Sequence, residues 1–316
     1  MPLDPQAQAF IERASSRPAP PPGSVPLADF RAAVRAMSAL DYDLQEVAEV
    51  RDVVIPRAGA DDLTVRVYRP AGDGPLPIAV WAHGGSWVRG DVEASDRAWR
   101  LVANESGCIV VGVEYALAPE SPFPGPLEDV YDAAVWARDH AEEIGGDARR
   151  LIIAGESSGG GVAAGVALLA RERGGPEFAQ QVLIVPLLDA TLSSPSWQEL
   201  GEDYMLTRPQ LEWALGLYAP GVDPSDGLLS PALADDLSGL PPALIVTGEY
   251  DPLRDDGERY AQRLEAAGIP ATHVRYAGMI HHAVLAPKAI ELGRTAYVET
   301  ARALGRAVGS GTQVGA

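Results

Sequence analysis

The sequence predicts an α/β protein with a mostly parallel, eight-stranded sheet that helices cover on both faces. Two observations lead to this fold class. Short apolar runs rich in Val and Ile recur from residue 50 onward, and longer helical segments separate most of them. Continuous apolar strands divided by helices are typical of parallel sheets that are buried on both faces.

Two short helical patterns come first, around residues 5–14 and 27–38, and the proline-rich stretch "RPAPPPGSVP" separates them. The strand-like runs then follow in this order: "RDVVIPR", "LTVRVYRP", "PIAVWAHGG", "CIVVGVEY", "RLIIAGE", "QVLIVPL", "PALIVTGEYD" and "ATHVRYAG". Among these runs we expect helices over 126–143, 158–173 and 255–267, and a last helix over 287–305.

The alternation breaks between residues 189 and 240, where large aromatic residues occur but no convincing strand. We interpret this segment as an insertion above the carboxyl ends of the strands, the edge at which open α/β sheets bind ligands. Its residues Trp197, Trp213 and Tyr218 are candidates, with Trp87, to line a substrate pocket. Packing inside the insertion explains the aromatic residues of the insertion equally well.

Composition argues against several kinds of partner. The chain of 316 residues has a formal charge of -19, whereas nucleic acids and anionic membranes bind basic surfaces. The one cysteine, Cys108, cannot form an intramolecular disulfide, and the first residues lack the pattern of a signal peptide. No apolar run is long enough to span a membrane. We therefore expect one elaborated cytoplasmic domain without stable membrane association.

A serine lies between two glycines in "GESSG", residues 155–159, after an apolar run and before helix material. Strand, tight turn and helix are the context of a nucleophile elbow, with Ser157 as the nucleophile. The glycines fit because so sharp a turn leaves no room for a Cβ. A phosphate-binding turn is the alternative, but the chain has neither the Walker lysine nor the G-x-G-x-x-G spacing.

A serine hydroxyl needs a base to take its proton, and the base needs an orienting group. His140 lies in a charged helical segment and His273 inside a strand, whereas His281 and His282 follow the last strand, where the base of such a fold is expected. We favour His281 over His282, partly on the family resemblance described below.

Four carboxylates follow the strand "ALIVTG" and are candidates for the orienting acid: Glu249, Asp251, Asp255 and Asp256. The last two fall where the next helix should begin, so that N-capping is their expected role. Glu249 suits a surface position. Asp251, which precedes a proline in a rigid turn, is the predicted acid.

The negative charge that develops on the substrate carbonyl needs main-chain N–H donors. One is expected from Ser158, which follows the nucleophile, and others from the loop "HGGSW", which starts with His83 and Gly84 and continues with Gly85 and Ser86. Glycines allow such a loop to turn its N–H groups toward a pocket. A plain tight turn is the alternative.

Together these motifs resemble the hormone-sensitive-lipase-like bacterial carboxylesterases of the α/β-hydrolase superfamily. The likeness covers residues 50–305 and runs through "HGGSW", "YALAPE", "FPGPLEDV", "GESSGG", "DPLRDDG" and the loop of His281. It implies a triad of Ser157, His281 and Asp251, and an oxyanion hole from the N–H groups of Gly85, Ser86 and Ser158. It also implies a helical cap over an α/β-hydrolase fold and no metal or organic cofactor.

By the same resemblance, residues 1–48 and 190–238 form the cap, and residues 49–189 and 239–305 form the catalytic core. From the composition of the last residues we expect 306–316 to be a disordered tail. The expected activity is hydrolysis of short- to medium-chain carboxylic esters through an acyl-enzyme, and relatives of this kind often form homodimers. Amide, peptide or lactone hydrolysis by the same triad is an alternative. A non-catalytic small-molecule binder is another, which the presence of His281 disfavours.

The chain departs from the family pattern at three places. Ser86 stands where a third glycine is usual, so a side chain borders the expected oxyanion site. Glu156 and Ser158 replace Asp and Ala on either side of the nucleophile. His282 and Ala283 replace the usual Gly-Phe after the catalytic histidine. We expect these positions to influence the reactivity of this particular protein.

Overall fold

A central eight-stranded sheet organises the computed structural model, which describes residues 1–16, 20, 21, 23–38 and 42–309. The strands are β1 (Glu49–Ile55), β2 (Leu63–Arg69), β3 (Leu76–Ala82), β4 (Ile109–Glu114), β5 (Gly146–Glu156), β6 (Gln180–Ile184), β7 (Ala243–Tyr250) and β8 (Ala271–Ile280). Their order in the sheet is β1-β2-β4-β3-β5-β6-β7-β8. Strand β2 runs antiparallel to β1 and β4, and all other neighbours are parallel, which confirms the predicted sheet.

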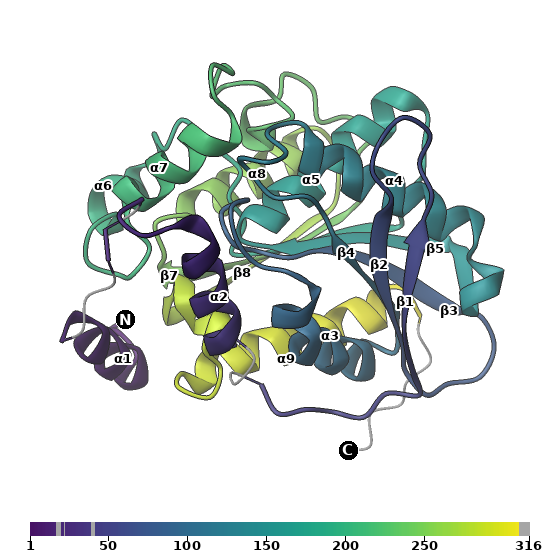
Figure 1. Cartoon of the computed structure of the whole chain (residues 1–316), viewed down its shortest axis with the longest axis horizontal. Coiled ribbons are helices and arrows are strands. Elements are labelled where there is room, and N and C mark those ends of the chain that lie inside the picture. The colour runs from purple at the N-terminus through teal and green to yellow at the C-terminus, as the bar shows by residue number, and fades with distance from the viewer. Residues whose placement is uncertain (17–19, 22, 39–41, 310–316) are drawn as a thin grey trace.

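Helices cover both faces of this sheet (Figure 1). One face packs against α3 (Val92–Ser106) and α9 (Glu291–Ala307), and the other against α4 (Gly125–Asp139), α5 (Ser158–Arg173) and α8 (Arg254–Ala266). Successive residues of β3 alternate between the two cores, because side chains of a strand point to opposite faces. Ile78 and Val80 contribute to the core beneath α4 and α5, whereas Ala79 and Trp81 contribute to the core beneath α3 and α9.

The remaining helices belong to the N-terminal segment and to the segment between β6 and β7. They are α1 (Pro5–Ser15), α2 (Leu27–Ser38), α6 (Pro195–Leu200) and α7 (Arg208–Tyr218), and short 3-10 turns lie at Glu142–Ile144, Pro231–Leu233 and His281–Leu285. As predicted, residues 190–238 contain no strand. The two segments meet where Phe30 of α2 contacts Trp213 of α7 edge to face, with ring centroids 6.1 Å apart.

Several boundaries differ from the sequence-based expectation. Helix α3 was not predicted, since its charged residues obscure the apolar stripe of Trp99, Val102 and Ala103 that it buries. The helix expected over 126–143 ends at Asp139, and the last helix begins later and continues to Ala307, two residues into the predicted tail. Parts of the proline-rich stretch and residues 310–316 of the tail lie outside the described residues.

The parallel strands bring the predicted site residues to one edge of the sheet. Strands β3, β5, β7 and β8 all run in the same direction, so that the loops after their carboxyl ends are neighbours. These loops contain "HGGSW", the serine turn, the acid loop and the histidine loop.

Of the helices in the described ranges, none combines the length and the apolar character that crossing a membrane requires.

Candidate active site

Ser157 occupies a sharp turn between β5 and α5. Its backbone has φ +55° and ψ -124°, a conformation that non-glycine residues rarely adopt. The turn is crowded: a Cβ on Gly155 would lie 2.3 Å from the carbonyl oxygen of Gly159, and a Cβ on Gly159 would lie 2.2 Å from that of Ala82. Both flanking glycines are therefore required by close approach of the backbone, as the sequence pattern predicted.

The structure brings the predicted nucleophile, base and acid into one hydrogen-bonded chain. Ser157 Oγ lies 3.0 Å from Nε2 of His281, and Nδ1 of His281 lies 2.9 Å from Oδ2 of Asp251. Because an ionised carboxylate only accepts hydrogen bonds, Nδ1 carries the proton and Nε2 is left to accept the proton of the serine hydroxyl. The exposed fractions are 7% for Ser157, 2% for His281 and 0% for Asp251, so these three side chains are nearly shielded from bulk water.

Asp251 is positioned by its own turn. Its second carboxylate oxygen, Oδ1, accepts a hydrogen bond of 2.8 Å from the N–H of Leu253, and its main-chain carbonyl accepts one of 2.9 Å from Arg254. These contacts direct Oδ2 toward the imidazole. The carboxylate is therefore held toward His281 by its own turn, as the predicted role of Asp251 requires.

The competing carboxylates have other environments. Glu249 accepts hydrogen bonds from the N–H of Gly278 and from the amino group of Met1, at 2.8 and 2.6 Å. The prediction that Asp255 and Asp256 cap α8 was wrong, because the helix begins at Arg254 and no side chain caps it. Asp255 instead accepts a 2.8 Å hydrogen bond from the N–H of Ser196, and burial raises the pKa of Asp256 well above its usual range.

Two of the other histidines are structural. Nε2 of His273 lies 2.8 Å from the hydroxyl of Thr247 on the neighbouring strand β7. His140 ends α4, where its ring stacks on Trp136 and Nδ1 lies 3.0 Å from the carbonyl oxygen of that residue. Neither has a contact with the serine, in agreement with the choice of His281.

The loop "HGGSW" lies beside the serine. A Cβ on Gly84 would lie 3.2 Å from Cβ of Ser157. Gly85, Ser86 and Trp87 all have positive φ, at +131°, +54° and +60°. Within the described chain the N–H groups of Gly85 and Ser86 and that of Ser158 donate no hydrogen bond, so they are free to bind an anion.

Glu156, one of the departures from the family pattern, holds this loop. Oε1 accepts a 2.7 Å hydrogen bond from the N–H of Gly84, and Oε2 accepts a 2.6 Å hydrogen bond from the indole of Trp81. Burial raises the pKa of the Glu156 carboxyl, while these hydrogen bonds and one from Tyr297 lower it. Its role in placing the loop was not predicted, since the contact joins residues that are 72 positions apart.

A second anchor of the loop comes from the N-terminal segment. Nε of Arg31 on α2 donates a 2.7 Å hydrogen bond to the carbonyl oxygen of Val88, and Nη2 donates one of 2.8 Å to that of Ala118. The same guanidinium forms an ion pair of 2.8 Å with Glu120. Hydrogen bonds thus hold the loop from α2 as well as from Glu156 in the core. The contact with α2 was not predicted from the sequence.

His83 supports the loop from within. Its Nδ1 lies 2.8 Å from the carbonyl oxygen of Gly84, and its ring stacks on Tyr115 with centroids 4.1 Å apart. Burial lowers the pKa of His83 to about 4, so the ring is neutral at physiological pH. The hydroxyl of Tyr115 donates a 2.7 Å hydrogen bond to the carbonyl oxygen of His83.

The aromatic candidates for the substrate pocket pack against one another. Trp87 and Tyr218 are both buried and stack with centroids 4.4 Å apart, which couples the loop to α7. Trp197 is buried beneath the guanidinium of Arg208, whereas Trp213 is only partly buried. Packing therefore accounts for Trp87, Trp197 and Tyr218, and a role in substrate binding stays a prediction for all four.

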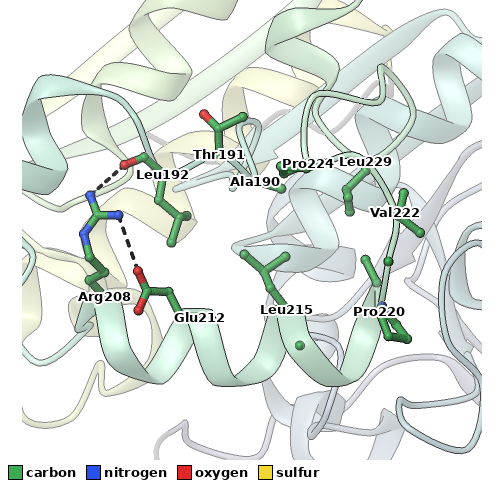
Figure 2. A pocket seen from close by; sticks show the side chains of 13 residues that line it. Ala190, Thr191, Leu192, Arg208, Glu212, Leu215, Pro220, Val222, Pro224 and Leu229 are labelled. Atoms are coloured by element: carbon green, nitrogen blue, oxygen red, sulfur yellow. Dashed lines mark hydrogen bonds and ion pairs between the residues drawn. The ribbon is translucent and has the colours of Figure 1, made fainter.

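A cavity of about 310 Å³ lies between α7 and the segment after β6 (Figure 2). Leu192, Leu215 and Val222 form part of its wall, and at one end Arg208 contacts Glu212 at 3.7 Å. No member of the serine–histidine–aspartate chain lines it. The cavity is therefore separate from the hydrogen-bonded residues Ser157, His281 and Asp251.

Ser158 and His282 carry buried polar atoms without a partner in the described part of the chain. These are Oγ of Ser158 and Nδ1 of His282. Burial, together with the nearby His281 and Arg89, lowers the pKa of His282 to about 3.

The described residues do not include a group of three or more His, Cys, Asp or Glu that is arranged to hold a metal ion.

Comparison with known proteins points in one direction. A family model of the alpha/beta hydrolase fold matches residues 79–285. Carboxylesterase NlhH of Mycobacterium tuberculosis (strain ATCC 25618 / H37Rv) is 41% identical over 255 residues, which are 78% of this chain and 80% of that protein. An arylesterase of Saccharolobus solfataricus is 34% identical over 290 residues, 91% of this chain and 94% of that protein. The crystal structure of an alpha/beta hydrolase enzyme from the metagenome of Lake Arreo, Spain, has a TM-score of 0.92 at 38% identity, over 97% of this chain and 99% of that chain.

Proposed function

Because the chain belongs to the hormone-sensitive-lipase-like carboxylesterases of the α/β-hydrolase fold and is an ester hydrolase, we propose that Ser157, His281 and Asp251 carry out its reaction as a catalytic triad. The observation that carries this proposal is the pair of contacts at 3.0 and 2.9 Å that joins the three side chains. The substrate is a small carboxylic ester, and short- to medium-chain acyl groups remain the expected range.

The first half of the reaction acylates the serine. As Ser157 Oγ forms a bond to the ester carbonyl carbon, Nε2 of His281 accepts the hydroxyl proton, and the carbonyl π electrons move to the oxygen. Asp251 stabilises the imidazolium through Nδ1–H. His281 then gives its Nε2 proton to the alcohol oxygen as the C–O bond breaks, which releases the alcohol and leaves the acyl-enzyme.

The second half repeats these steps with water. His281 accepts a proton from a water molecule whose oxygen attacks the acyl carbon, and then returns that proton to Ser157 Oγ as the bond to the serine breaks. The acid leaves and the enzyme is restored. In both halves, the N–H groups of Gly85, Ser86 and Ser158 face the developing oxyanion, where each donor is worth about 3 kcal/mol.

The cap and the assembly are also proposals. The contact of Phe30 with Trp213 supports a single cap made of residues 1–48 and 190–238. Strand β8 is an edge strand of the sheet, which supports a homodimer formed through that edge, and a sizing measurement tests it. A cytoplasmic location and a disordered tail stay predictions.

The triad is tested by replacing the nucleophile. Ser157→Ala is expected to lower kcat for p-nitrophenyl acetate by about 10⁴- to 10⁶-fold with unchanged circular dichroism, because the residual rate comes only from binding and the oxyanion donors. Ser24→Ala, at an exposed serine, is the matched control. Retained turnover in Ser157→Ala overturns the assignment. Anilide turnover that equals ester turnover would instead favour amide hydrolysis.

A further inference from the structure

Arg89 stands out because the described residues offer its guanidinium no acidic partner. It neither forms an ion pair nor donates a side-chain hydrogen bond, although the chain contains 44 acidic residues. Neighbouring arginines are paired: Arg31 with Glu120 at 2.8 Å, and Arg35 with Asp91 at 2.7 Å. Asp91, the acid closest to Arg89 in sequence, and Glu120 are thus already paired.

The side chain of Arg89 starts beside the loop of the proposed oxyanion donors and reaches Phe30 on α2. It follows the loop that carries the proposed oxyanion donors, and its Cγ would lie 3.1 Å from a Cβ on Gly85. The guanidinium lies over the ring of Phe30 on α2, with Cζ 5.2 Å from the ring centroid. Its positive charge also acts on His282, where it is one cause of the lowered pKa. The cation therefore lies over α2 and beside the loop, within electrostatic reach of His282.

The surroundings of Arg89 do not compensate its charge. It is partly buried, and burial alone lowers the pKa of the guanidinium, with no carboxylate close enough to oppose this. An arginine nevertheless stays protonated at neutral pH. A cation–π contact is weak compared with the hydration that a desolvated cation loses. An anion from outside the chain would therefore gain an electrostatic attraction to the guanidinium and hydrogen bonds from it.

His282 offers a second polar group within electrostatic reach of Arg89. Its Nδ1 is buried and has no partner in the described chain, and its ring centroid lies 5.8 Å from that of His281. A neutral imidazole whose Nδ1 is protonated can donate one hydrogen bond to a carboxylate oxygen. The planar guanidinium can donate two parallel hydrogen bonds, one to each oxygen of a carboxylate.

We propose that Arg89, with His282 beside it, forms a carboxylate-binding subsite, so that the enzyme accepts esters that carry a second, anionic carboxylate, such as monoesters of short dicarboxylic acids. The proposal rests on ester hydrolysis at Ser157 and adds a substrate class to it. The reaction itself is unchanged: water and the monoester give the dicarboxylic acid and the alcohol. The overall charge of -19 repels such substrates at long range, and the subsite supplies the local attraction.

The test compares two substrates in the full-length enzyme, monomethyl glutarate and the neutral methyl pentanoate, by following acid release. Arg89→Met should lower kcat/KM for monomethyl glutarate at least tenfold and that for methyl pentanoate less than twofold, because only the first loses charged hydrogen bonds. Arg89→Lys should fall between, since it keeps the charge without the planar pair of donors. Glutarate should inhibit methyl pentanoate hydrolysis competitively in the wild type and about tenfold more weakly in Arg89→Met.

Arg173→Met is the matched control, because Arg173 also lies over an aromatic ring, that of Tyr131, but is paired with Glu128. An equal loss in this variant would mean that net charge is responsible and would overturn the proposal. Equal losses for both substrates in Arg89→Met, or no inhibition of the wild type by glutarate, would also overturn it. If the wild type hydrolysed neither ester, the failure would lie with ester hydrolysis at Ser157 and not with the subsite alone.

Discussion

Replacing Glu156 by Gln tests whether this side chain sets the geometry of "HGGSW", the loop of the proposed oxyanion donors. The carboxylate accepts hydrogen bonds from the N–H of Gly84 at 2.7 Å, from the indole of Trp81 at 2.6 Å, and from Tyr297. An amide has one oxygen, so that its NH₂ group must face at least one of these donors. At least one charge-assisted hydrogen bond, worth about 1.5–3 kcal/mol, is lost.

The net loss in the free energy of unfolding is smaller than the sum of two such hydrogen bonds. Burial raises the pKa of Glu156, which shows that desolvation of its charge opposes the hydrogen bonds, and a neutral amide does not carry that penalty. We expect the free energy of unfolding to fall by about 1–3 kcal/mol. Displacement of Gly84 also moves the N–H groups of Gly85 and Ser86, so kcat should fall by about 10- to 100-fold with KM nearly unchanged.

Urea unfolding and steady-state hydrolysis of p-nitrophenyl acetate measure these two effects. Glu46→Gln, at an exposed glutamate without a side-chain partner in the described chain, is the matched control and should change neither. Wild-type kcat in Glu156→Gln would refute the role of this residue in the loop. A fall in stability with unchanged kcat would show that the hydrogen bonds are structural only.

Two further predictions concern buried polar groups. Ser158→Ala removes a buried hydroxyl without a partner among the described residues, so urea unfolding should show equal stability or a gain of up to about 1 kcal/mol, and kcat should change less than twofold because the N–H remains. A tenfold loss of kcat would instead assign the hydroxyl to the reaction. Burial lowers the pKa of His83 from 6.5 to about 4, so the unfolded chain binds the proton first and stability is lost as the pH falls from 6.5 toward 4. This loss, roughly 3 kcal/mol at about 1.4 kcal/mol per pH unit, should be absent from His83→Gln, and parallel stability curves of the two proteins would contradict it.

Much of the fold could be predicted from local patterns. Apolar runs bounded by turns located all eight strands, and the helix over 158–173 was predicted with its observed bounds. Helix α3 was missed because its burial depends on packing against α9 and the sheet, while its own sequence is rich in charge. Local periodicity reports a helix only where the apolar face is continuous.

The sequence by itself determined the elbow, the chain order of Ser157, Asp251 and His281, and the glycine-containing loop. Steric limits on a sharp turn are local, and each of these residues directly follows an apolar run that predicts a strand. Only the tertiary structure decided that Asp255 does not cap α8, that Glu156 holds Gly84, and that Arg89 has no acidic partner in the described chain. These contacts join residues that lie far apart in sequence. Which side chains meet, and which charge is left without a partner, depends on how the helices pack on the sheet.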